Sequence, residues 1–170
     1  MKQPLLPVLL FSLLGLLVFS ANAFAEGKVK TGAIQVLFDR GLEGKTDAQK
    51  TQLNQVGDYF ESYFCRLFTE AGYTVTKITS RDQFDPASGQ YLLTVKTVNY
   101  NPGSKAARIL VGLGAGVTTL KIHYELFGAD KDALIAKDQE RGSSRDWQFL
   151  CKTLSKDTLK EVKTAFETKK

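Results

Sequence analysis

The stretch TTLKIHYEL, residues 118–126, constrains the fold more than any other feature of the chain. Its apolar side chains recur at every second position, while lysine, histidine and glutamate fill the positions between them. Successive side chains of a strand point to opposite faces, so this pattern predicts a strand with one dry and one wet face. Such a strand belongs to a sheet that is covered on one side only. The rest of the chain must supply that cover.

Two stretches have apolar residues at helical spacing. The first is predicted to run from Thr46 to Gly72, with Thr46 and Gln49 as a capping box, and the second to begin where Ser143 and Asp146 form its cap. The stripes consist of Leu53, Val56, Phe60, Tyr63, Phe64, Leu67, Phe68 and Ala71 in the first, and Trp147, Leu150, Cys151, Leu154, Thr158, Val162 and Ala165 in the second. We interpret both stripes as core rather than as ligand-stacking surfaces.

Four further stretches read as strands, at residues 34–38, 73–78, 91–100 and 134–141, the last of them polar and at or near a sheet edge. The predicted order is strand, helix, strand, strand, glycine-rich segment, strand, strand, helix. The expected fold class is α+β, with two helices on one side of a mixed, mostly antiparallel sheet of about five strands. Residues 26–170 are expected to form this single domain.

Residues 1–25 have the pattern of a cleaved signal peptide. Lys2 precedes the apolar run 5–18, and Ala21-Asn22-Ala23 or Ala23-Phe24-Ala25 offers the small-residue cleavage pattern. No cysteine follows the apolar run, so a lipid-acylation site is not expected. We therefore predict a periplasmic protein, with secretion or association with the outer membrane as alternatives.

The charge pattern argues against nucleic acid as a partner. The chain has 23 lysines and arginines against 18 acidic residues. The lysines of the last helix alternate with Asp157 and Glu161, as on a solvated helix face. Weak attraction to anionic lipid or peptidoglycan is the more plausible consequence of this mild positive charge.

Cys65 and Cys151 are the two cysteines of the chain, and each lies on one of the predicted helices. In an oxidising compartment two lone cysteines most simply form a disulfide, which would tie the helices together. Two buried free thiols are the alternative.

No catalytic or metal-binding set is evident, so we expect no enzyme, no cofactor and no metal. His123 is the only histidine, and it shares the wet strand face with Lys121 and Glu125. A zinc site needs more such ligands, and no G-x-S-x-G motif is present. Pairs of aspartates occur at Asp82 and Asp85 and again at Asp130 and Asp132. Both pairs lie in predicted turns, where aspartate commonly bonds the local backbone.

The segment SKAARILVGLGAG, Ser104–Gly116, is almost uncharged and repeats glycine at every second position near its end. A phosphate-binding loop leaves a strand and opens a helix, whereas this segment leads into a strand. It is also too short to span a membrane as a helix. We expect its backbone to pack closely over the sheet, with a surface for a partner or for self-association, or contact with lipid, as alternatives. The candidate surface consists of Lys105, Arg108, Gly112, Gly114 and Gly116.

The run from Asn101 to Gly142 resembles the signature of the DUF4410 family of bacterial envelope proteins, whose function is unknown. The matching positions are Gly103, Ser104, Ala107, Arg108, Gly112, Gly114 and Gly116. The resemblance implies an exported envelope protein and supplies no catalytic residues, and the missing acylated cysteine departs from many members. The order of elements is also distantly similar to the TolB amino-terminal domain, the lipoprotein activators of penicillin-binding proteins, and the curli secretion channel subunit.

These observations favour a non-enzymatic envelope module that binds another envelope component. A self-associating subunit of a ring or secretion channel is the alternative. A cell-wall hydrolase that uses Asp39, Asp82 or Asp85 is a third, weaker hypothesis.

Overall fold

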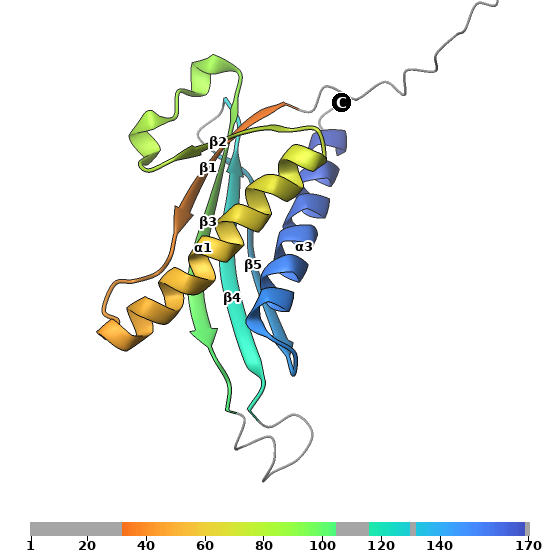
Figure 1. Cartoon of the computed structure of the whole chain (residues 1–170). Helices are drawn as coiled ribbons and strands as arrows, with labels where there is room; N and C mark the ends of the chain where they lie inside the picture. The colour runs from red at the N-terminus through yellow and green to blue at the C-terminus, as the bar shows by residue number, and fades with distance from the viewer. Residues whose placement is uncertain (1–31, 105–115, 130–131, 169–170) are drawn as a thin grey trace, which may run out of the picture.

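A five-stranded sheet carries two long helices on one of its faces (Figure 1). The computed structural model describes residues 32–104, 116–129 and 132–168. The elements are β1 (Ala33–Asp39), α1 (Asp47–Glu70), β2 (Thr74–Ile78), the 3-10 turns η1 (Arg81–Gln83) and η2 (Pro86–Ser88), β3 (Tyr91–Asn101), β4 (Thr118–Phe127), β5 (Ala133–Ser143) and α3 (Trp147–Thr168). This architecture confirms the predicted α+β class and the predicted order of strands and helices.

The strands lie in the order β2-β1-β3-β4-β5. Strand β1 pairs in parallel with both β2 and β3, so the first strand of the fold lies inside the sheet. Strands β3, β4 and β5 pair antiparallel, with a bulge between Thr97 and Asn99. The sheet is therefore mixed, as predicted, with parallel and antiparallel pairs in equal number. Strand β5 lies at the edge of the sheet, as its polar sequence predicted.

The two helices begin with different caps. In α1 the side chain of Thr46 accepts a hydrogen bond from the Gln49 backbone N–H, and the Gln49 side chain accepts one from the Thr46 N–H, which confirms the predicted capping box. In α3 the prediction that Ser143 caps the helix is wrong. Strand β5 extends through Ser143, and Asp146 is the cap, because its Oδ1 accepts from the Phe149 N–H at 2.8 Å.

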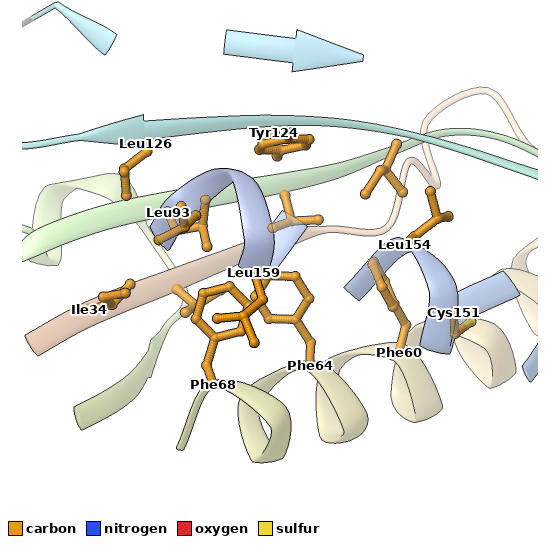
Figure 2. Close-up of a cluster of buried hydrophobic side chains, with 14 of the residues drawn as sticks. Ile34, Phe60, Phe64, Phe68, Leu93, Tyr124, Leu126, Cys151, Leu154 and Leu159 are labelled. Carbon is orange, nitrogen blue, oxygen red and sulfur yellow. The ribbon is translucent and has the colours of Figure 1, made fainter. Parts of the chain in front are cut away.

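The core lies between the helices and the covered face of the sheet (Figure 2). Phe60, Phe64 and Phe68 project from one side of α1, and the Phe64 and Phe68 rings stack with centroids 4.5 Å apart. They meet the dry face of the sheet, which includes Tyr124 and Leu126. Burying each such side chain stabilises the fold by about 1.5–3 kcal/mol. The interpretation of the aromatic stripe as core is confirmed.

The helices lie side by side and run in the same direction (Figure 1). Tyr59 of α1 meets Trp147 at the start of α3, with ring centroids 5.3 Å apart. Tyr73, just after α1, meets Phe166 near the end of α3 at 5.8 Å. α1 thus covers the β1 side of the sheet and α3 the side of β4 and β5.

The predicted disulfide is absent, because Cys65 and Cys151 are both free thiols. Cys151 is fully buried, and burial raises its pKa to about 12. Cys65 is half-buried near Lys77 and Glu61, and burial raises its pKa as well. The two helices do lie side by side, as a disulfide between them would require. However, Cys65 faces the β2 side of α1, and Cys151 lies near Tyr100.

Candidate functional site

The glycine-rich segment begins and ends at a narrow closure at one end of the sheet, which we call the neck and define as residues 101–104 and 116–118. Of the predicted surface, Lys105, Arg108, Gly112 and Gly114 lie outside the described residues. Gly116 is described and lies just before β4. The structure therefore describes only the two chain ends that flank the candidate surface.

Two glycines bring the two sides of the neck together. Gly103 and Gly116 have positive φ angles of 73° and 64°, a conformation that glycine adopts at little cost. The Ser104 N–H donates to the Gly116 carbonyl at 3.0 Å. A Cβ atom on Gly103 would lie 2.4 Å from the Gly116 oxygen, so no other residue fits there without displacing backbone.

Side chains brace the same closure. The Thr118 hydroxyl donates to the Pro102 carbonyl across the neck at 2.9 Å. Asn101 accepts a hydrogen bond from the Gly103 N–H at 2.9 Å and so turns the chain out of β3. Strand β3 ends at Asn101, directly before Pro102 and Gly103.

A hollow of about 210 Å³ lies beside the neck, between the start of α1 and the end of β3. It is lined by Gly41, Lys45, Gln49, Gln52, Leu53, Thr97, Val98, Asn99, Tyr100 and Pro102. The hollow combines hydrogen-bonding side chains with an apolar one, since the Val98 side chain is 43% exposed. Burial, and to a smaller extent Cys151, raises the pKa of Tyr100 in its wall.

Sequence reasoning missed this hollow because it depends on contacts between distant segments. The bulge at Thr97 and Asn99 displaces the end of β3. Gly41, with φ of 65°, then lies so close to β3 that a Cβ would meet the Thr97 carbonyl oxygen at 2.2 Å. Nothing in the sequence that follows β1 indicates which strand Gly41 approaches.

The uncovered face of the sheet carries a network of charges. His123 Nδ1 lies 2.7 Å from Asp138 Oδ1, and Lys121 forms an ion pair with the other oxygen of Asp138 at 2.9 Å. The bond from Lys121, and then that from His123, lowers the pKa of Asp138. His123 Nε2 also lies 3.7 Å from Glu125. As predicted, His123 shares the wet face with Lys121 and Glu125.

The aspartates considered as catalytic candidates that the structure describes bond groups close to them in the chain. Asp39 accepts from the Gly41 N–H at 2.8 Å and pairs with Lys96. Asp85 accepts from the Ala87 N–H at 2.9 Å and caps η2. Asp82 lies in η1, where its carboxylate meets the Ser80 hydroxyl. Asp130 lies outside the described residues, so the second aspartate pair is not placed.

The fold is similar to solved structures at low sequence identity. PelC from Paraburkholderia phytofirmans, described as a dodecamer, matches with a TM-score of 0.53 and 12% identity over 76% of this chain and 86% of that chain. A variant of that dodecamer gives 0.49 and 9% identity, over 76% and 87%. A neuraminyllactose-binding hemagglutinin homologue from Helicobacter pylori gives 0.33 and 10%, over 68% and 66%. The first match shows a shared fold; the likenesses to TolB, the lipoprotein activators and the curli channel subunit stay predictions.

Two further findings concern the sequence and the helices. Comparison with curated proteins finds no match. Among residues 32–104, 116–129 and 132–168, no helix is long and apolar enough to cross a membrane.

The sequence model of one family covers more than half of the chain. This is the domain of unknown function DUF4410, which matches residues 42–147. The matched range includes the neck, the glycine-rich segment and the strands on either side of it. The chain belongs to the DUF4410 family.

Proposed function

We propose that this chain is an exported, non-enzymatic envelope protein that works by binding another envelope component through the glycine-rich segment and the hollow beside it. The observation that carries the proposal is the neck. It fixes both ends of a nearly uncharged segment at one end of the sheet. The leader-like residues 1–25 support export.

The neck gives the segment a preorganised base. Two hydrogen bonds, Ser104 to Gly116 and Thr118 to Pro102, join the residues that follow β3 to those at the start of β4. Binding costs free energy for every residue that must be ordered, and a closed base lowers that cost. The strands on both sides belong to the middle of the sheet, so the base is also anchored in the core.

The hollow supplies recognition next to this base. Lys45, just before α1, and Gln49 and Gln52 of α1 contribute donors and acceptors, and Val98 contributes an exposed apolar side chain from β3. This mixture suits a protein segment that buries a small apolar side chain and satisfies its own backbone groups. The histidine and the aspartates considered as catalytic candidates do not line the hollow: His123 lies against Asp138, and Asp85 bonds its local backbone.

Self-association into a ring or channel is the second candidate. PelC, whose fold is similar, is described as a dodecamer. In this chain β5 forms a long sheet edge, and such edges can pair with another copy. We propose that, if copies associate, the neck and the hollow lie in the contact between them.

The test compares two glycine variants of the protein from Glu26 to Lys170. Gly103→Ala places a methyl group against the Gly116 oxygen, whereas Gly89→Ala has a similar positive φ but nothing within 4 Å. Solution mass by light scattering, in buffer and in mild detergent, measures self-association, and cross-linking in a cell-envelope extract measures partner binding. We expect Gly103→Ala to lose the association or cross-link that Gly89→Ala retains.

The outcomes separate the two candidates. A monomer that cross-links to a specific envelope protein supports the binding module. A defined oligomer sensitive to Gly103→Ala moves self-association ahead. If wild type and both variants are monomeric and form no specific cross-link, or if both variants behave as wild type, the neck has no role in binding and the proposal is wrong.

A further inference from the structure

The outer side of α3 carries a row of lysines that the structure separates from their neighbouring acids. Lys152, Lys156, Lys160 and Lys163 follow each other at spacings of four, four and three residues, which places them along one side of the helix. All four are exposed. Within the described part of the chain, no ion pair involves any of them. We call these four residues the lysine row.

The acids that alternate with the lysine row in the sequence point to the neighbouring strand instead. Asp157 forms an ion pair with Arg141 of β5 at 2.8 Å, and Glu161 forms one with Lys137 of β5 at 2.9 Å. The edge strand thus neutralises the acidic side of α3. The mixed charges expected for a solvated helix are sorted onto two sides, and the outward side is basic.

An exposed aromatic residue continues the same row. Phe149 lies three residues before Lys152, so it occupies the same side of α3. Its side chain is 39% exposed, and it is one of two large apolar side chains exposed to this degree in the described residues. The Arg145 guanidinium lies 4.9 Å from its ring centroid. From Phe149 to Lys163 the row extends for about 21 Å, at 1.5 Å per residue.

A shallow hollow runs along the later part of the row. It has a volume of about 410 Å³ and is lined by Lys156, Leu159, Lys160, Lys163, Thr164 and Glu167. Three ammonium groups thus surround a surface whose floor includes the apolar Leu159, and Glu167 is its one acid. A headgroup phosphate placed there meets several positive charges within a short distance.

We infer that this side of α3 docks on an anionic phospholipid surface. The charges are complementary, and long lysine side chains can lie along apolar surface while their ammonium groups reach phosphates. The row follows a straight, outward-facing helix, which fits a plane better than it fits a threaded polymer (Figure 1). Phe149 at its end provides an apolar group for the boundary between headgroups and acyl chains.

This surface is distinct from the neck, because it lies on a different element, and the inference does not depend on the proposed function. Neither the lysine row nor Phe149 belongs to the neck or lines the hollow beside it. The two activities can therefore be lost separately, and each has its own variants.

The test measures co-sedimentation with vesicles, using the protein from Glu26 to Lys170, which retains every described element. The vesicles contain phosphatidylcholine alone or with one-fifth phosphatidylglycerol. In one variant glutamine replaces all four lysines of the row. The control variant has the same change in charge, with glutamine at Lys50, Arg66, Lys96 and Lys121, which lie on α1, β3 and β4. Circular dichroism and thermal melting establish that both variants fold.

We expect wild type and control to bind the anionic vesicles at low salt and to release them as salt rises. Each lysine near an anionic surface contributes roughly fivefold in affinity, so the row variant should lose on the order of a hundredfold or more. Phe149→Ser should weaken vesicle binding but not binding to soluble dextran sulfate. If the row variant and the control variant lose the same affinity for anionic vesicles, net charge alone explains the binding and the inference is overturned. If the protein binds dextran sulfate as tightly as it binds anionic vesicles, and Phe149→Ser weakens neither interaction, the lysine row binds a soluble polyanion instead.

Discussion

Replacing Gly57 by alanine tests how α1 is joined to the end of β1. Gly57 lies in the middle of α1, where alanine ordinarily stabilises a helix by about 1 kcal/mol. Here a Cβ would lie 2.9 Å from both Cδ and Nε of Arg40. Glycine thus makes room for the Arg40 side chain, which crosses over the helix at this point.

The cost of displacing Arg40 follows from its partners. Its Nε donates to Glu61 at 2.8 Å, and its other nitrogens donate to Asn54 and Asp58. Glu61 is only 6% exposed, and a hydrogen bond to a buried charged group is worth about 1.5–3 kcal/mol. Asp58 is exposed, so its ion pair adds little. Subtracting the helix-propensity gain leaves a net destabilisation of about 1 kcal/mol.

The assay is thermal and urea unfolding of four proteins: wild type, Gly57→Ala, Arg40→Ala and the double variant. We expect Gly57→Ala to lower Tm by about 3–4 °C in the wild-type background. In the Arg40→Ala background the same change should stabilise by about 1 kcal/mol, because the obstructing side chain is gone. If Gly57→Ala stabilises equally in both backgrounds, the space at Gly57 is not reserved for Arg40 and the reasoning fails.

Two further predictions concern the thiols and the charged sheet face. Unfolded protein should give two free thiols with Ellman's reagent. In the folded protein at mildly alkaline pH, Cys65 should react slowly and Cys151 hardly at all, because burial raises the pKa of Cys151 to about 12. No reactive thiol after unfolding would instead establish a disulfide. Lys121 and His123 lower the folded-state pKa of Asp138, so its contribution to stability is present above the unfolded value of about 3.9 and is lost as pH falls through the folded value. Tm should therefore fall less steeply below about pH 4 in Asp138→Asn than in wild type, and parallel curves would contradict this.

The parts of the fold that the sequence predicted depend on local periodicity. Phe60, Phe64 and Phe68 fall on one helix face by spacing alone. The four residues from Thr46 to Gln49 are enough to identify the start of this helix. The order of strands required more. Ile34 pairs with Val75 on one side and with Tyr91 on the other, and no local pattern indicates that the first strand lies between two later ones.

The candidate site was only partly predictable for the same reason. Gly103 and Gly116 were identified as positions that resemble the family signature, but their mutual approach is a contact between two separate segments of the chain. The lysine row was hidden by the alternation of charges along α3. Its basic character emerges only because Arg141 and Lys137 of β5 bind the intervening acids. The predicted disulfide was wrong although both helices were correctly placed side by side. The rotation of each helix about its own axis decides where its cysteine points, and this rotation depends on tertiary packing.

The position of β1 between β2 and β3 changes what the range of the family match means. The match begins at residue 42 and ends at residue 147, so it leaves out β1, the strand that joins β2 to β3, and nearly all of α3. A fragment cut at those limits would divide the sheet and expose Leu120, Ile122 and Tyr124 to water. The stretch of this chain that the family model matches is thus smaller than the unit that folds. Chimaeras between members should exchange the region from β1 through α3 as one piece.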